Sequence, residues 1–348
     1  HDGDVVAFGT CGHGWVGHHR TMASDEERAE RRPYRRQRST SLRAKLRRIA
    51  FAIAPPRPSG FTSDTSRAAY ESAYHDAVES LWPVPVESRF TETSFGPTHA
   101  LVSGPEDAPP LVLLHGAGLA AVSWYPNAAR LAASHRIVAI DCVFDSGLGR
   151  QVQLIRGRRD VAHWLAEVID GLGLDRPAVA GLSQGGWMAA SLALFEPART
   201  SKVALLAPAA TVQAFRLPVA MFLRYSYLFR RGDTVDSSRR TFDMVFGGRF
   251  TPDDRFVRLA AVGSAGFRYA RPPVMPGRFS DADLRAMGGP MLVLLPSLDQ
   301  IYSPAKAYER ARRLLPEAEV EMVPGAGHFV AMEAAYRVSR RVLSFRAE

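Results

Sequence analysis

Short apolar runs alternate along this chain with longer segments in which apolar residues recur every three or four positions. The runs have the length of β-strands and most of them are almost entirely apolar, which is typical of a parallel sheet covered by helices on both faces. They lie at residues 111–114, 137–141, 178–181, 203–206, 291–295 and 319–323. The helix-like segments lie at residues 124–134, 158–169, 187–195, 304–315 and from 330 onwards. The pattern therefore predicts an α/β fold with a mostly parallel sheet.

An amphipathic helix and a hairpin are predicted before the first run. Apolar side chains recur at helical spacing over residues 70–81. Residues 88–92 and 99–103 flank Phe-Gly-Pro at 95–97, a sequence that favours a turn, and are predicted to pair at the edge of the sheet. We therefore expect the folded domain to begin near residue 61.

Residues 208–289 break the alternation, because they contain no strand-like run although they are rich in large apolar side chains. An insertion at this point is expected above the carboxyl ends of the strands. We predict a helical cap here, between two parts of the core at residues 61–207 and 290–348. Packing of the cap onto the core is the alternative role for its apolar residues. Those predicted to line a substrate pocket are Phe215, Met221, Phe222 and Tyr225.

Residues 1–60 carry most of the excess positive charge. They hold twelve Lys or Arg and six Asp or Glu, and so account for +6 of the net charge of +9. This composition predicts a disordered extension, and removal of residues 1–58 is expected to change activity and melting temperature little. A basic amphipathic helix over residues 41–54 is the alternative. Nucleic-acid binding is not expected, because Tyr34 is the one aromatic residue among the arginines.

Cysteine usage and the length of the apolar runs bear on the compartment. Cys11 and Cys142 have no sequence reason to pair, so no disulfide is expected, which favours a reducing, cytoplasmic location. No apolar run approaches the roughly 20 residues that a membrane-spanning helix needs. We therefore expect no transmembrane segment. The oligomeric state is left open by the sequence.

The segment Gly181-Leu182-Ser183-Gln184-Gly185-Gly186 joins a strand-like run to a helix-like segment. A turn this tight forces the serine into a strained conformation with positive φ, and the residues two before and two after it must be small. Gly181 and Gly185 meet this need. The next helix points its positive N-terminal end at the hydroxyl, which suits a nucleophile for acyl transfer. A plain glycine-rich turn is the alternative, so the rest of the chain must decide.

A nucleophile of this kind needs an acid and a base later in the chain. His328 is the one histidine of ten that follows Ser183, and it lies in a glycine-rich loop between the last strand and the last helix. Imidazole can take the serine proton and return it to the leaving group. Asp299 lies four residues after the strand-like run at 291–295, where a carboxylate can hold the imidazole. A helix-capping role before Ser303 is the alternative for Asp299.

Acyl transfer also needs two backbone N–H donors for the developing oxyanion. Gln184, directly after the serine, is predicted to supply one donor. Ala117, in the His-Gly-Ala-Gly loop after the strand-like run at 111–114, is predicted to supply the other. His115 is expected to orient this loop and, together with Trp124, to border the substrate. An ordinary strand-to-loop glycine pair is the alternative.

These motifs resemble those of bacterial carboxylesterase-like proteins of the α/β-hydrolase fold, over roughly residues 61 to 345. The segments that carry the resemblance are Tyr74 to Pro85, Phe95 to His99, Leu113 to Ala117, Trp124 to Asn127, Gly181 to Trp187 and Leu205 to Ala209. The resemblance implies the same nucleophile, acid, base and oxyanion donors as the residues do. It does not extend to substrate preference, because Phe144 to Gln151 differs from the Gly-x-Gly-x-Ser-like turn usual in the family.

Residues and resemblance together predict a serine hydrolase that cleaves small-molecule carboxylic esters through an acyl-enzyme, with no cofactor and no metal. Uncharged, short- to medium-chain or aromatic esters are the expected substrates. A C–C bond hydrolase or a non-hydrolytic enzyme on the same fold is the alternative, because one fold hosts many chemistries. A non-catalytic binding protein is the third hypothesis, and a complete triad argues against it.

Overall fold

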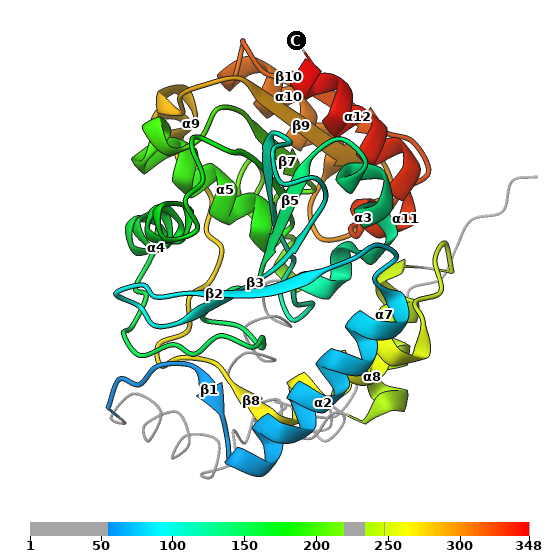
Figure 1. Ribbon diagram of the computed structural model, residues 1–348. Helices are drawn as coiled ribbons and strands as arrows, with labels where there is room; N and C mark the ends of the chain where they lie inside the picture. Colours follow the sequence, from blue (N-terminus) through cyan, green and yellow to red (C-terminus); the bar gives the residue numbers. More distant parts are fainter. Residues whose placement is uncertain (1–54, 219–233, 247, 348) are drawn as a thin grey trace, which may run out of the picture. The chain divides into compact units, whose positions relative to one another are not determined.

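The structure of the protein is a computed structural model that describes residues 55–218, 234–246 and 248–347 (Figure 1). The proposed N-terminal extension falls almost entirely outside these residues, as do three of the four predicted pocket residues of the cap. None of the helices within the described ranges has the length and apolar character required to cross a membrane.

An eight-stranded sheet forms the centre of the fold, in the order β10-β9-β7-β6-β4-β5-β3-β2. Strands β2 and β3 run antiparallel to their neighbours, and the other pairs are parallel. The strands are β2 (Glu87–Thr91), β3 (Thr98–Ser103), β4 (Pro110–Leu114), β5 (Arg136–Ile140), β6 (Ala178–Leu182), β7 (Val203–Leu206), β9 (Met291–Pro296) and β10 (Glu319–Val323). The predicted α/β fold with a mostly parallel sheet is confirmed, and β2 and β3 form the predicted edge hairpin.

Helices cover both faces of this sheet (Figure 1). One face is covered by α3 (Tyr125–Ala132), α11 (Val330–Glu333) and α12 (Ala335–Ala347), with the short η1 (Ala121–Trp124) leading into α3. The other face is covered by α4 (Arg158–Gly171), α5 (Gln184–Phe195), α9 (Asp281–Ala286) and α10 (Pro304–Leu314); the short η2 (Pro197–Arg199) follows α5. Parallel strands need such crossover helices, so the layers follow from the alternation in the sequence.

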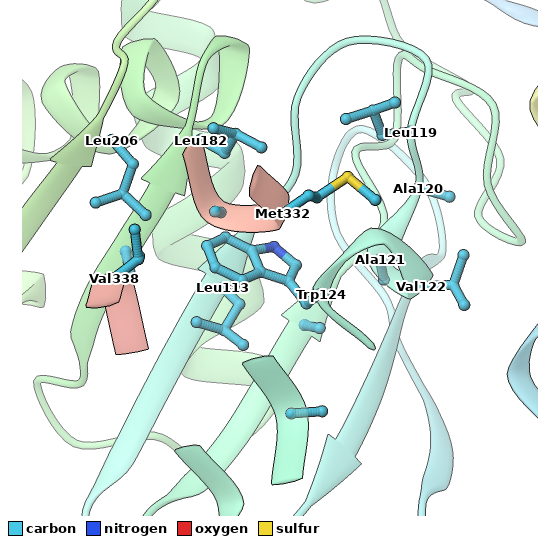
Figure 2. Packing of buried hydrophobic residues seen from close by; sticks show 14 of the residues in the cluster. Leu113, Leu119, Ala120, Ala121, Val122, Trp124, Leu182, Leu206, Met332 and Val338 are labelled. Carbon is cyan, nitrogen blue, oxygen red and sulfur yellow. The ribbon is translucent and has the colours of Figure 1, made fainter. Parts of the chain in front are cut away.

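Every strand of the large sheet except the edge strand β2 contributes side chains to two separate hydrophobic cores, because successive residues of a strand point to opposite faces. Leu113 belongs to the core under α3, α11 and α12, whereas Leu114 belongs to the core under α4 and α5. Figure 2 shows the first of these cores, where Trp124 lies among Leu113, Met332 and Val338. The runs in β4, β5, β6, β7 and β9 are therefore buried on both faces, as their apolar composition predicts, whereas β10 is only partly buried.

A further group of helices lies beside the sheet and combines residues from before and within the insertion. Helix α2 (Asp64–Leu81) packs against α8 (Asp254–Gly266), and α8 packs against α7 (Val235–Phe246). The two-residue strands β1 (Gly60–Phe61) and β8 (Phe267–Arg268) pair antiparallel. The helical character predicted between residues 208 and 289 is thus present in α7, α8 and α9. The pairing of this region with α2 was not evident from the sequence.

Helix α2 illustrates how the sequence sets a local boundary. Ser63 caps its N-terminus by accepting a hydrogen bond from the Ser66 N–H, and the Ser66 hydroxyl oxygen accepts one from the Ser63 N–H. Tyr70 and Tyr74, one turn apart, are buried together on the face that meets α8 and the sheet. The predicted amphipathic helix is therefore present with the buried face that its spacing indicates.

Contacts of the folded domain are present a few residues before position 61. The Ser59 N–H donates to Gln151 Oε1 at 2.7 Å, and the Ser59 hydroxyl accepts a bond from the Ala270 N–H at 2.8 Å. Arg57 forms an isolated bridge with Arg271. Removal of residues 1–58 would therefore take away part of these contacts, namely the bridge of Arg57.

Candidate active site

Ser183 lies at the turn between β6 and α5 in the strained conformation that its sequence predicts, with φ +54° and ψ −111°. A positive φ at a non-glycine residue is costly and is maintained only by the surrounding structure. A Cβ placed on Gly181 would lie 2.2 Å from the Gly185 carbonyl oxygen, and one on Gly185 would lie 2.1 Å from the Leu114 oxygen. Both positions therefore exclude any side chain.

Ser183, His328 and Asp299, which the sequence predicts to act together, are hydrogen-bonded in the structure. His328 Nε2 lies 2.7 Å from Ser183 Oγ, and His328 Nδ1 lies 2.7 Å from Asp299 Oδ2. Because a carboxylate only accepts hydrogen bonds, Nδ1 carries a proton and Nε2 accepts from the serine hydroxyl. All three side chains are buried, and Ser183 is the most exposed of them at 8%.

Asp299 and His328 lie in the loops that follow β9 and β10, at the carboxyl ends of the strands, like Ser183 after β6. The second carboxylate oxygen of Asp299 accepts a bond from the Ile301 N–H at 2.8 Å. The N-cap of α10 is Ser303 rather than Asp299. The capping alternative for Asp299 therefore does not describe this structure.

Tyr302 is a neighbour of this cluster that sequence reasoning missed. Its ring meets the His328 ring edge-on, with centroids 6.3 Å apart. Burial raises the pKa of Tyr302 well above its ordinary value, and the negative charge of Asp299 raises it further. The phenol therefore stays protonated beside the carboxylate. Its position three residues after Asp299 was the available signal.

His115 ties the loop after β4 to the loop after β5. Its Nε2 accepts a hydrogen bond from the Cys142 N–H at 3.0 Å, so Nδ1 carries the proton and donates to the Gly116 carbonyl oxygen at 2.7 Å. The side chain has no exposed surface. The expected orienting role fits this position. The predicted contact with substrate does not, because both ring nitrogens already bind the protein backbone.

The loop with the predicted oxyanion donor lies beside the serine. A Cβ placed on Gly116 would be 3.5 Å from Ser183 Cβ. The Gly118 N–H donates to Asp145 Oδ2 at 2.8 Å, and the other oxygen of this buried carboxylate accepts from the Tyr269 hydroxyl at 3.2 Å. Asp145 thus anchors the loop that holds Ala117. Sequence reasoning missed Asp145, although it lies in the segment that departs from the family pattern.

The remaining predicted substrate contacts have different outcomes. Trp124 is 2% exposed and lies in the core under α3 and α11, so it supports the fold instead of bordering an open site (Figure 2). Phe215 is half-buried. Met221, Phe222 and Tyr225 lie outside the described residues. Among the residues that are described, no three His, Cys, Asp or Glu side chains are grouped to hold a metal ion.

A second serine, histidine and aspartate are linked elsewhere in the sheet. His99 Nδ1 lies 2.8 Å from Asp141 Oδ2, and His99 Nε2 lies 2.7 Å from the hydroxyl of Ser88 on β2. Asp141 also accepts bonds from the backbone N–H groups of Ala121 and Leu148. Burial alone would raise the pKa of Asp141, but the hydrogen bond and charge interaction with His99, together with His115 and the Ala121 N–H, lower it below its ordinary value.

Residues 111–341 match the model of the alpha/beta hydrolase family, and this range contains the whole Ser183 cluster. The chain belongs to the alpha/beta hydrolase family. The hydrolase is 35% identical to the uncharacterized carboxylesterase nap of Bacillus subtilis (strain 168) over 79% of this chain and 91% of that protein. It is 31% identical to carboxylesterase YbfK of the same strain, over 82% and 96%.

Solved structures place the hydrolase among the same proteins. The crystal structure of naproxen esterase (carboxylesterase NP) from Bacillus subtilis superposes with a TM-score of 0.74 at 33% sequence identity. The match covers 82% of this chain and 99% of that chain. The resemblance to carboxylesterase-like proteins of the α/β-hydrolase fold is therefore confirmed.

Proposed function

We propose that this hydrolase is a serine carboxylesterase with Ser183 as nucleophile, His328 as base and Asp299 as the group that orients the base. The observation that carries the proposal is the continuous hydrogen-bonded chain from the strained Ser183 through His328 to Asp299. The relatives of the chain carry the same activity in their names, which supports carboxylic esters as the substrate class.

Acylation uses the proton positions that the hydrogen bonds define. The Ser183 hydroxyl gives its proton to His328 Nε2 as its oxygen attacks the ester carbonyl carbon. The carbonyl oxygen becomes an oxyanion, for which we propose the backbone N–H groups of Ala117 and Gln184 as donors. The imidazolium then protonates the departing alkoxide, and the acyl group remains on Ser183.

Deacylation repeats the same steps with water in place of the serine hydroxyl. His328 Nε2 takes a proton from water as the water oxygen attacks the acyl carbon. The bond between that carbon and Ser183 Oγ then breaks, the imidazolium returns the proton to Oγ, and the carboxylic acid leaves. Asp299 accepts the hydrogen bond from Nδ1–H throughout both steps, so that Nε2 always faces the reacting oxygen. The N-terminal end of α5 lies directly after Ser183 and favours negative charge there.

For the substrate we propose uncharged esters with a short- to medium-length or aromatic acyl group. Phe215 is half-buried and directly precedes Arg216, whose backbone N–H donates to the Ile301 carbonyl oxygen at 2.9 Å near Asp299, which supports an apolar pocket at this place. A relative named naproxen esterase supports acceptance of an aromatic acid. A cap over residues 208–289 that closes the pocket is part of this proposal. A cytoplasmic location is a further part; it rests on cysteine usage and on Cys142 being a buried free thiol.

A series of p-nitrophenyl esters from acetate to octanoate tests the proposal. Each methylene that enters an apolar pocket contributes about 0.8 kcal/mol, so kcat/KM should rise about two- to fourfold per carbon until the pocket is full. A flat profile would refute the pocket. Absence of turnover for every ester would refute carboxylesterase activity and favour a C–C bond hydrolase or a non-hydrolytic enzyme.

A further inference from the structure

Glu333 at the end of α11 binds the chain on both sides of His328. Its Oε2 accepts the Gly327 N–H at 2.7 Å, and its Oε1 accepts the Phe329 N–H at 3.2 Å. The Glu333 side chain is only 1% exposed. One buried carboxylate therefore fixes the backbone of the residue before and of the residue after the proposed base.

The partner of this carboxylate comes from the insertion between β7 and β9. Arg249, in the connection between α7 and α8, donates from Nε to Glu333 Oε2 at 2.7 Å. Its guanidinium lies over Gly327, where a Cβ would be 2.1 Å from Nη2 and 2.9 Å from Cζ. The glycine directly before His328 is therefore required for the arginine to reach the carboxylate.

Aromatic contacts join the same two regions. The Phe329 ring lies 5.1 Å from the ring of Phe246 and 6.5 Å from that of Phe242, both on α7. The loop that holds His328 is thus bound to α7 by apolar packing and to the following connection by an ion pair. These contacts are independent of the bond between His328 and Asp299.

A buried carboxylate without a countercharge is strongly unfavourable, so Glu333 depends on Arg249 for its position. A displacement of about 1 Å at a catalytic group can cost on the order of a hundredfold in rate. We propose that Arg249 and Glu333 are positioning residues that hold His328 in line with Ser183 and thereby couple the insertion to the base. This inference rests on the proposed function.

Kinetics of Arg249→Met, Glu333→Gln and the double variant with p-nitrophenyl acetate test the proposal. Each single variant should lower kcat about ten- to a hundredfold, while KM changes less than about threefold, because the base moves and the substrate pocket does not. The double variant should lose less than the product of the two single losses, because the two residues act as one unit. Arg249→Lys keeps the charge without the planar fork and should restore kcat only in part.

Arg158→Met is the matched control. Arg158 forms a 3.0 Å ion pair with Asp283 of α9, and its side chain is 31% exposed against 23% for Arg249. This pair also joins the insertion to the core but does not touch the His328 loop, so kcat should stay within about twofold of wild type. The melting temperature of every variant is measured to keep the assay below unfolding. If Glu333→Gln does not fold, the two Arg249 variants carry the test.

Two results would overturn the proposal. One is a kcat within twofold of wild type in Arg249→Met. The other is a loss of kcat in Arg158→Met as large as that in Arg249→Met. Failure of the proposed function is recognised separately, because wild type would then hydrolyse no ester. In that case the rate at which a fluorophosphonate labels Ser183 replaces kcat, and a wild type that is not labelled refutes both proposals.

Discussion

Within the described residues, two hydrogen-bonded Ser–His–Asp networks have nearly the same hydrogen-bond distances. In the first, Ser183, His328 and Asp299 are joined at 2.7 and 2.7 Å; in the second, Ser88, His99 and Asp141 are joined at 2.7 and 2.8 Å. In both, the histidine and the aspartate are buried. Bond lengths alone therefore do not distinguish the proposed active site from the network of Ser88, His99 and Asp141.

The two serines differ in where the backbone places them. Ser183 has a positive φ, lies at the N-terminus of α5 and adjoins the loop at Gly116. Ser88 is an exposed residue of the edge strand β2. The aspartates also differ, since Asp141 accepts further hydrogen bonds from the backbone N–H groups of Ala121 and Leu148. The comparison indicates that the backbone setting of the serine, and not the hydrogen bonds to histidine and aspartate, is what distinguishes the proposed nucleophile.

The largest expected effect is that of Ser183→Ala. Without the nucleophile, the residual acceleration over water should be about 10³- to 10⁴-fold, from the oxyanion hole and binding alone. The variant should fold normally, because the hydroxyl is a small group at a turn set by glycines. Hydrolysis of p-nitrophenyl acetate and the melting temperature are measured on the same sample. Wild-type turnover by Ser183→Ala would mean that another residue attacks the ester.

Replacing each aspartate by asparagine should have different effects in the two networks. Asp299→Asn should lower kcat by about 10⁴-fold, because the amide favours the wrong tautomer of His328. Asp141→Asn should instead lower the free energy of unfolding by about 3–5 kcal/mol, because N–H donors converge on a buried site where an amide NH₂ cannot accept them. Urea unfolding and kinetics of both variants provide the measurements. A stable Asp141→Asn would show that this network is not needed for folding.

The sheet and most residues of the candidate site could be predicted from the sequence, for physical reasons that differ between residues. The sheet follows from apolar runs whose period and length are local properties. Ser183 follows from two glycines that a strained turn demands, and His328 from the chain order of the fold. Asp145 and the Arg249–Glu333 pair depend on contacts between residues 27 and 84 positions apart, respectively. No local pattern marks such contacts. The burial of Trp124 in the core could not be predicted, because an aromatic residue near a site and one in the core look alike in sequence.

The pH dependence of stability should reflect Asp141. Its pKa is lowered in the folded protein, so the unfolded chain binds the proton more readily. This contribution is fully present above the unfolded pKa of about 3.9 and is lost as pH falls toward the folded value. The difference in unfolding free energy between wild type and Asp141→Asn should therefore shrink below about pH 4. Urea titrations between about pH 3 and 7 test this; a difference that is constant with pH would contradict the lowered pKa.

The smallest expected effect is that of Ser88→Ala. Its hydroxyl donates to His99 at an exposed edge strand, so its loss should cost about 0.5–1.5 kcal/mol of stability and leave kcat/KM unchanged. The relay alone should not make Ser88 reactive, because an ordinary strand residue has neither the strained turn nor the helix end that Ser183 has. A fluorophosphonate probe should accordingly label wild type and Ser88→Ala equally and leave Ser183→Ala unlabelled. Mass-spectrometric detection of the probe on Ser88 would contradict this view and show that a buried His–Asp pair suffices to activate a serine.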